Sequence, residues 1–591
     1  MALLDVENLT IRYAGSASPA VENLSFALAR GESLGIVGES GSGKTQAALA
    51  IMGLLPANAK ISGSVRFDDA ELIGAGAAVL NQYRARRIAM VFQDPMAALN
   101  PYVRIGDQLR RILLEHKLCA ADEASARTLL MLKKVGLPDP ERQYRAFPHQ
   151  LSGGMRQRVM IGAALLGEPD VLIADEPTTA LDVTVQAQIL YLLRQLRAET
   201  KAALLLITHD LGVIAGNCER MFVMDRGEML EEGTTRQVFA TPDSDKMRAL
   251  LTNAPTLSAI GMSGALPEGG DPVLDISELS VSFSEGRLRG RERLLAVRPI
   301  SLTIQKAETV AVVGESGSGK TSLARAIVGL IPIDSGRVTF LGKQLPAAVS
   351  RRRHDSRRDL QMVFQDPLAS LNPAMRVSSI VGEPLRVHES GRKNHAALVE
   401  AMLEQVGLAP ELSQRYPHEL SGGQAQRVAI ARALILKPKV VICDEAVAAL
   451  DGTVRSEILL LLQAAQQRTG LSIIFITHDL AVVRQISHRV LVMYMGRLCE
   501  LAANNALFGR PRHPYTRALL NAVPSPDPNA EPANAPLPGE VSSLLRPPAG
   551  CPFHPRCQHA VGACSASVPE PAAYGGTIVA CHRATELDLR Y

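Results

Sequence analysis

The stretch GESGSGKT occurs twice, at residues 38–45 (the first phosphate loop) and 314–321 (the second phosphate loop). Glycines at these spacings let the backbone turn tightly, so that its N–H groups face phosphate oxygens at a helix N-terminus. The lysine then reaches the β- and γ-phosphates, and the hydroxyl that follows it ligates Mg²⁺. The residues predicted to bind nucleotide and metal in this way are Gly38, Ser40, Gly41, Gly43, Lys44 and Thr45, and Gly314, Ser316, Gly317, Gly319, Lys320 and Thr321.

Two adjacent acids end an apolar run in each half of the chain, in VLIADE (171–176) and VVICDE (440–445). We expect the first acid of each pair, Asp175 and Asp444, to lie beside the metal. The second acid, Glu176 or Glu445, is then placed to polarise the water that attacks the γ-phosphate. The alternative is that these acids only cap the next helix, which the spacing to the other motifs disfavours. The pattern predicts nucleotide hydrolysis.

These motifs belong to an internal repeat. MVFQDP, LSGG and ITHDL each occur twice in the same order, and the two copies of each are separated by nearly the same number of residues. Such spacing indicates two homologous domains. The predicted organisation is a first domain at 1–255, a Gly/Ser/Pro-rich linker at 256–271, a second domain at 272–524, and a Pro-rich, Cys-containing tail at 525–591.

The elements that position these residues follow from short apolar runs. SLGIVG (33–38) and TVAVVG (309–314) run straight into the phosphate loops, and LLLIT (204–208) and IIFIT (473–477) have the same character. Continuous apolar runs of this length are typical of buried parallel strands. A strand, a Gly-rich loop and a helix in that order are the context that a phosphate loop requires. We predict an α/β fold in each domain.

The composition of the chain argues against nucleic-acid binding, membrane spanning and secretion. A net charge of +4 over 591 residues and an aromatic content of 4%, with no Trp, disfavour nucleic-acid binding by bulk charge or base stacking. No window of about 18 apolar residues is present, and the N-terminus lacks the basic and apolar segments of a secretory signal. We therefore expect a cytoplasmic chain that meets a membrane only through other subunits.

The order of motifs resembles that of ABC transporter ATPases, twice over, along nearly the whole chain. The resemblance implies that each domain has a RecA-like core, an antiparallel β subdomain and a helical subdomain. It also implies that Gln93 and Gln365 contact Mg²⁺ and sense membrane subunits. The resemblance also implies roles for three further pairs: the D-loop residues Asp182 and Asp451, the catalytic switch histidines His209 and His478, and the adenine-stacking Tyr13 and Phe283. For Tyr13 and Phe283 a role in the hydrophobic core is the alternative.

Such ATPases bind ATP between two domains, so the resemblance implies two composite sites. The first phosphate loop is expected to work with Ser421, Gly422 and Gly423, and the second with Ser152, Gly153 and Gly154. The halves differ after the catalytic acid, because DEPTTALD (175–182) becomes DEAVAALD (444–451). Both glutamates remain, and we expect both sites to hydrolyse ATP at unequal rates.

Further motifs narrow the resemblance. FQDP followed by LNP, LSGGMRQRVMI (151–161) and HPYTRALLNAVP (513–524) are similar to the dipeptide/oligopeptide/nickel importer ATPases. This implies two transmembrane permease subunits and an extracytoplasmic solute-binding protein as partners, with the chain peripheral on the cytoplasmic side of the inner membrane. Peptides are the expected cargo; nickel, opines and glutathione stay open. The rivals are an exporter ATPase and a soluble twin-cassette protein that acts on ribosomes or DNA.

Four of the eight cysteines lie in the tail, at Cys551, Cys557, Cys564 and Cys581. Clustered thiols in a cytosolic chain favour a soft metal over disulfides. In the importer ATPase family that this chain resembles, the matching motif is associated with a [4Fe–4S] cluster, which takes four Cys ligands. Zn²⁺ and no metal are the alternatives.

Overall fold

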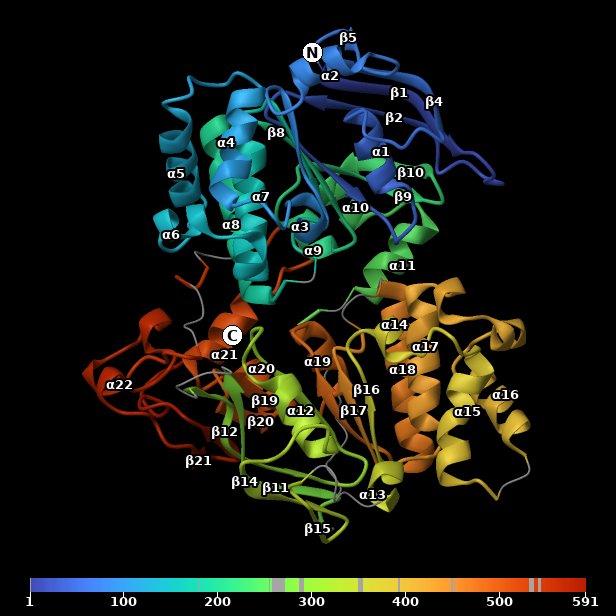
Figure 1. Cartoon of the computed structure of the whole chain (residues 1–591), viewed down its shortest axis with the longest axis vertical. Helices are drawn as coiled ribbons and strands as arrows, with labels where there is room; N and C mark the ends of the chain where they lie inside the picture. Colours follow the sequence, from blue (N-terminus) through green and yellow to red (C-terminus); the bar gives the residue numbers. More distant parts are fainter. Residues whose placement is uncertain are drawn as a thin grey trace. The chain divides into compact units, whose positions relative to one another are not determined.

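The computed structural model describes residues 2–179, 181–254, 256–257, 271–285, 292–348, 354–391, 394–447, 450, 452–530, 536–539 and 544–590. The chain forms two compact units (Figure 1): unit 1 is Met1–Ala254 with Pro524–Pro536, and unit 2 is Pro255–Val523 with Leu537–Tyr591. Most of the predicted linker 256–271 lies outside the described residues, and so does Asp451.

A six-stranded sheet forms the centre of unit 1, in the order β10-β9-β3-β8-β7-β6. The last five strands pair in parallel, and β10 pairs antiparallel with β9. The apolar strands β3, β7 and β8 are buried along their whole length, as expected where helices cover both faces. The strands are β3 (Ser33–Val37), β6 (Ile88–Val91), β7 (Val171–Asp175), β8 (Ala203–Thr208), β9 (Arg220–Asp225) and β10 (Glu228–Thr234).

A second, antiparallel sheet in unit 1 has the order β2-β1-β4-β5 and shares a hydrophobic core with one face of the central sheet. Its strands are β1 (Ala2–Tyr13), β2 (Val21–Ala29), β4 (Ala59–Phe67) and β5 (Ala70–Glu71). A separate core joins the other face of the central sheet to a group of helices that includes α4, α5 and α7 (Figure 1). The helices of unit 1 are α1 (Lys44–Ile51), α2 (Ala77–Tyr83), α3 (Pro95–Ala98), α4 (Ile105–Glu115), α5 (Ala124–Lys134), α6 (Pro140–Arg145), α7 (Gly153–Leu165), α8 (Val183–Thr200), α9 (Leu211–Ala215), α10 (Thr235–Ala240) and α11 (Asp245–Asn253).

Unit 2 repeats this plan with a wider central sheet, in the order β16-β17-β18-β13-β19-β20-β22-β21. Its antiparallel sheet has the order β12-β11-β14-β15. The strands are β11 (Leu274–Glu285), β12 (Glu292–Ile304), β13 (Thr309–Val313), β14 (Ser335–Phe340), β15 (Lys343–Leu345), β16 (Leu360–Val363), β17 (Val440–Asp444), β18 (Ser472–Ile476), β19 (Arg489–Tyr494), β20 (Arg497–Ala503), β21 (Ala572–Tyr574) and β22 (Thr577–Val579).

Most helices of unit 2 follow the order of those in unit 1, apart from α22 in the tail and a 3-10 helix in the place of α6. The helices of unit 2 are α12 (Lys320–Val328), α13 (His354–Asp359), α14 (Pro367–Ser370), α15 (Val377–His388), α16 (His395–Gln405), α17 (Gly422–Leu434), α18 (Gly452–Thr469), α19 (Leu480–Ile486), α20 (Asn504–Gly509), α21 (Pro514–Asn521) and α22 (Gly562–Ala566). No helix among the described residues is both long and apolar enough to cross a bilayer. The predicted α/β fold, with an antiparallel sheet and a helical part in each half, is confirmed.

The tail extends the central sheet of unit 2. Strand β22 pairs antiparallel with β20, so that Glu500 faces Val579 and Leu501 faces Ile578, and β21 completes the edge. Ile578 also packs against the hydrophobic core of this unit. The segment that bears the four clustered cysteines is therefore built into the fold of unit 2.

Candidate functional site

The first phosphate loop joins β3 to α1. Gly43, at the N-cap of α1, has a φ of 99°, and a Cβ there would lie 2.5 Å from the carbonyl oxygen of Ala20. Only glycine fits such a position. The Nζ of Lys44 donates to the carbonyl oxygens of Gly38 and Glu39, both at 2.8 Å. The lysine thus lies folded over its own loop, at the place where the phosphates are expected.

Two side chains placed to hold a metal meet beside this loop. Thr45 Oγ1 donates to Asp175 Oδ1 at 3.2 Å, which brings the start of α1 to the carboxyl end of β7. Burial raises the pKa of Asp175 to about 6, against the opposing hydrogen bond from Thr45. A divalent cation would favour the ionised carboxylate, because an opposite charge lowers the pKa of an acid.

Glu176 is the centre of a hydrogen-bonded group. Gln93 Nε2 donates to Glu176 Oε2 at 2.9 Å, Thr179 Oγ1 donates to the same oxygen at 2.8 Å, and His209 Nδ1 lies 3.2 Å from Oε1. Burial alone would raise the pKa of Glu176, but the hydrogen bond and charge of His209 and the Thr179 hydroxyl lower it to about 2. The carboxylate is therefore ionised at neutral pH, as a group that accepts a proton from water must be.

The second phosphate loop has the same geometry. Lys320 Nζ donates to the carbonyl oxygens of Gly314 (2.7 Å) and Glu315 (2.9 Å), and Thr321 Oγ1 donates to Asp444 Oδ1 at 3.1 Å. Burial raises the pKa of Asp444 as it does for its counterpart. Each unit thus brings a lysine, a hydroxyl and an aspartate together at one edge of its parallel sheet, where ligands bind in open α/β sheets.

The glutamate of unit 2 is held less fully. Gln365 Nε2 donates to Glu445 Oε2 at 2.6 Å, and His478 Nδ1 lies 3.7 Å from Glu445 Oε1. The residue that corresponds to Thr179 is Ala448, which has no hydroxyl to donate. The pKa of Glu445 is lowered, first by the hydrogen bond to His478. Among the residues that the structure describes, the same acid therefore has one hydrogen-bond donor fewer in unit 2.

Both glutamates have a backbone conformation that the sequence did not predict. The φ angle is 45° at Glu176 and 49° at Glu445, in the left-handed region that costs an ordinary residue about 1–2 kcal/mol. The chain holds it by a bond to the neighbouring strand, since the N–H of Glu176 donates to the carbonyl oxygen of Ile207. Glutamate has no preference for this region, so no local signal was available.

The two LSGG segments open helices. Ser152 and Ser421 are the N-caps of α7 and α17, and their hydroxyls accept from the N–H groups of Met155 (3.2 Å) and Gln424 (3.3 Å). The predicted residues at these two helix starts are Ser152, Gly153, Gly154, Ser421, Gly422 and Gly423. In both segments the serine and the first glycine are exposed, namely Ser152, Gly153, Ser421 and Gly422. Their role opposite a phosphate loop stays a prediction, because it concerns a site between the two units.

The predicted adenine contacts differ between the units. The hydroxyl of Tyr13 hydrogen-bonds to the side chain of Gln46, the residue after Thr45, and its ring packs on the core below. Phe283, the counterpart in β11, is 42% exposed. Asp182 is the N-cap residue of α8. Tyr13 is thus beside the first phosphate loop, and both the stacking role and the core role remain compatible with its position.

One small cavity in unit 2 is lined by all four tail cysteines, together with His513, Phe553, His554, His559 and His582 among others. None of the four is in a disulfide, and burial raises the pKa of the Cys551, Cys557 and Cys581 thiols. Within the described ranges, no three His, Cys, Asp or Glu side chains are gathered into a group that could hold a metal ion. The thiols share a cavity without forming a completed ligand set.

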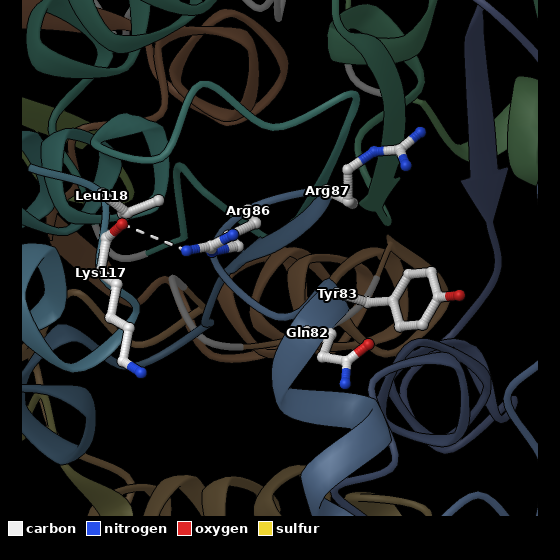
Figure 2. Close-up of a pocket in the computed structure, with 6 residues that line it drawn as sticks. All are labelled: Gln82, Tyr83, Arg86, Arg87, Lys117 and Leu118. Atoms are coloured by element: carbon white, nitrogen blue, oxygen red, sulfur yellow. Dashed lines mark hydrogen bonds between the residues drawn. The ribbon is translucent and has the colours of Figure 1, made fainter.

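A larger cavity of about 530 Å³ lies in unit 1, lined by Gln82, Tyr83, Arg86, Arg87, Lys117 and Leu118 (Figure 2). Its guanidinium groups already have partners: Arg86 donates to the carbonyl oxygens of His116 and Lys117, and Arg87 pairs with Asp68 and Asp170. No residue predicted to bind nucleotide lines it. It is separate from the site described above.

Comparison with known proteins agrees with this geometry. The ABC transporter family matches residues 21–179 and 297–448, and the oligopeptide/dipeptide transporter C-terminal region matches residues 499–564. The glutathione import ATP-binding protein GsiA of Escherichia coli (strain K12) is 43% identical over 567 residues, covering 90% of each chain. GsiA of Pectobacterium atrosepticum is 42% identical over 562 residues, covering 89% of this chain and 90% of that one. The chain belongs to the ATP-binding proteins of ABC transporters, in the peptide-importer family, with two nucleotide-binding domains in one polypeptide.

Proposed function

We propose that this protein is the ATP-hydrolysing subunit of an ABC importer that takes up glutathione or a similar short peptide. The observation that carries the proposal is the duplicated group of lysine, Thr–Asp pair and Glu–Gln–His at the carboxyl ends of neighbouring parallel strands. The identity to import proteins over nine tenths of the chain supports the direction of transport. A soluble twin-cassette protein acting on ribosomes or DNA has no comparable support.

The roles proposed for the site residues are supported by their geometry. On ATP binding, Lys44 and Lys320 leave the carbonyl oxygens of their own loops and bind the β- and γ-phosphates. Mg²⁺ would be held by Thr45 and Asp175 in unit 1 and by Thr321 and Asp444 in unit 2, where it would neutralise phosphate charge. Gln93 and Gln365, which donate to Glu176 and Glu445, would then contact the metal.

The proposed hydrolysis step is supported by the side chains around each glutamate. Glu176 and Glu445 are ionised, so each accepts a hydrogen bond from the attacking water and orients it towards the γ-phosphate. His209 and His478 bind the γ-phosphate. The LSGG helix of the opposite unit donates its N-terminal N–H groups to the same phosphate, so ATP joins the two units and hydrolysis separates them.

The proposed assembly contains two transmembrane permease subunits, with this chain on the cytoplasmic face of the inner membrane, and an extracytoplasmic solute-binding protein. We would purify the chain from mildly detergent-solubilised membranes and identify its partners by mass spectrometry. Two multi-span permeases at a 1:1:1 ratio are expected. Ribosomal or DNA-repair proteins in their place, with no membrane protein, would contradict the importer.

The cargo is tested on the solute-binding protein, because the transported molecule binds there first. We expect calorimetric titration of that protein to give a dissociation constant for glutathione at or below the micromolar range, and none for Ni²⁺. Glutathione is supported by the similarity of this chain to glutathione import ATP-binding proteins. Binding of Ni²⁺ or an opine alone would reassign the cargo and leave the ATPase mechanism unchanged.

We further propose that Cys551, Cys557, Cys564 and Cys581 hold a [4Fe–4S] cluster. The support is that all four thiols line one cavity and that none is in a disulfide. The four thiols would hold the cluster as thiolates, so they would lose their protons on ligation. Anaerobically purified protein is expected to absorb near 400 nm. A colourless protein that carries one equivalent of zinc would assign the site to Zn²⁺.

A further inference from the structure

A buried ion pair joins the tail to the second phosphate loop. Arg556, the residue before Cys557, donates from Nη1 to Glu315 Oε2 at 2.7 Å and from Nη2 to Glu315 Oε1 at 3.0 Å. The side chains are 5% and 3% exposed. Two parallel bonds between a guanidinium and a carboxylate fix the position of both groups. Glu315 is the second residue of the phosphate loop, so the tail reaches the loop itself.

Further hydrogen bonds and aromatic rings surround this ion pair. The Nε of Arg556 donates to the carbonyl oxygen of Pro538 at 3.2 Å, and its Nη1 lies 3.4 Å from the Tyr494 hydroxyl. The hydroxyl of Tyr515 accepts from the N–H of Glu315 at 2.9 Å. The ring of Phe553, also in the tail, packs against both tyrosines at centroid distances of 5.5 and 5.3 Å. The pair is therefore the polar centre of an aromatic cluster.

Glu315 is also bonded to the lysine that is proposed to bind phosphate. Its carbonyl oxygen accepts from Lys320 Nζ at 2.9 Å, its N–H donates to Tyr515, and its carboxylate binds Arg556. The carboxylate that Arg556 binds and the carbonyl oxygen that Lys320 must leave for ATP thus belong to one residue.

Unit 1 holds the equivalent glutamate in another way. Lys246 Nζ lies 2.6 Å from Glu39 Oε2 and 3.5 Å from Asp225 Oδ1. The segment KMRALL (246–251) corresponds to YTRALL (515–520), so Lys246 stands where unit 2 has Tyr515. The Lys246 and Glu39 side chains are 20% and 25% exposed. In unit 1 the cation comes from the last helix of the domain and meets water; in unit 2 it comes from the tail and is buried.

We propose that Arg556 is a positioning residue for the second phosphate loop, so that nucleotide binding in unit 2, and not in unit 1, depends on the tail. Loss of one partner of a buried pair leaves an uncompensated charge and strongly destabilises the local structure. Without Arg556 the loop must shift so that the carboxylate of Glu315 reaches water. That shift moves the carbonyl oxygen of the same residue, which places Lys320. The proposal rests on the nucleotide-binding role proposed above for the second loop.

The test uses the full chain with Lys44→Ala, which leaves unit 2 as the site that binds nucleotide. The dissociation constant of a fluorescent ATP analogue with Mg²⁺ is measured with and without Arg556→Gln. We expect Arg556→Gln to weaken binding by about tenfold, and addition of Glu315→Gln to restore affinity to within about threefold of the parent, since the unpaired charge is then removed. An affinity within about twofold of the parent for a folded Arg556→Gln variant would overturn the proposal.

Matched variants distinguish a positioning role of Arg556 from a general loss of folding. In the reciprocal background, Lys320→Ala, the affinity of unit 1 is expected to stay unchanged on Arg556→Gln; an equal loss there would overturn the proposal. Arg590→Gln, which removes an exposed ion pair with Asp588, controls for changes in the tail. If Arg556→Gln does not fold, Arg556→Lys is used, which keeps the positive charge but loses the two parallel bonds to Glu315; a loss of about threefold is expected, and an unchanged affinity contradicts the proposal.

The failure of the proposed function gives a different result. If the Lys44→Ala parent with an intact tail binds no nucleotide while the wild-type chain does, unit 2 is not a nucleotide site and the function proposed for its loop is wrong. If the parent binds nucleotide and Arg556→Gln binds it equally well, only the role of the tail is wrong.

Discussion

The two phosphate loops have the same eight residues, but the molecule supports them differently. In unit 1 the glutamate of the loop pairs with the partly exposed Lys246, and the catalytic-type Glu176 has three donors around it. In unit 2 the glutamate pairs with the buried Arg556, and Glu445 lacks the threonine. Unit 1 therefore has a threonine hydroxyl beside its proposed base, and the loop of unit 2 is bound by an arginine of the tail. Identical motifs thus stand in different surroundings, and we expect the two sites to differ in activity.

The largest expected effect comes from removing the base in each unit separately. Glu176→Gln should lower the steady-state rate of phosphate release by about 100-fold or more, since general-base catalysis contributes at least that much. Glu445→Gln should lower it by less than about tenfold, because the less fully held base contributes less to turnover. ATP binding is the control and should persist in both. Equal losses would show that the two sites hydrolyse alike.

The second comparison concerns the stability of each loop's ion pair. Arg556→Gln should lower the free energy of unfolding of unit 2 by about 3 kcal/mol, because it leaves a buried carboxylate unpaired. Lys246→Gln should cost unit 1 less than about 1 kcal/mol, since that pair meets solvent. Urea unfolding followed by hydrogen exchange in each unit measures both. A larger loss of unfolding free energy for Lys246→Gln than for Arg556→Gln would show that the ion pair of unit 1 stabilises its loop more.

A third prediction concerns pH and magnesium in unit 1. The pKa of Asp175 is raised to about 6, so the carboxyl is protonated below that pH and must lose its proton to bind a cation. In a Lys320→Ala background, the apparent dissociation constant for Mg²⁺ with bound nucleotide should be about tenfold higher at pH 5 than at pH 7. Asp175→Asn is the control, because it removes this titration. The same pH dependence in the control would assign it to the nucleotide.

The smallest effect distinguishes the two LSGG helices. Gln424 closes a capping box with Ser421, in which its side chain accepts from the Ser421 N–H at 3.0 Å, whereas unit 1 has Met155 at this position. Gln424→Met should cost about 0.5–1 kcal/mol of stability in unit 2, and Met155→Gln should add a few tenths in unit 1. Thermal unfolding of the two variants measures this. If Gln424→Met stabilised unit 2 and Met155→Gln destabilised unit 1, the capping box would not explain the difference between the two helix starts.

Much of the site could be predicted from the sequence, because local order determines it. A strand, a glycine loop and a lysine bring Lys44 and Thr45 to one end of a sheet, and a second strand that ends in Asp175 must reach the same edge. The link between Arg556 and Glu315 could not be predicted. It joins residues 241 positions apart, and the two loops are identical in sequence, so only the packing of the tail shows that their partners differ. The left-handed backbone at both glutamates likewise depends on a bond to a neighbouring strand.

We propose that ATP hydrolysis in this chain drives import through membrane partners. The most direct measurement is glutathione uptake into proteoliposomes that contain the two permeases and this chain, with Mg-ATP on the side of the chain and the solute-binding protein on the other side. We predict uptake that requires ATP and the binding protein and that Glu176→Gln abolishes. ATP hydrolysis that continues at the same rate without permeases or loaded binding protein, with no uptake of glutathione or any other peptide, would contradict the account.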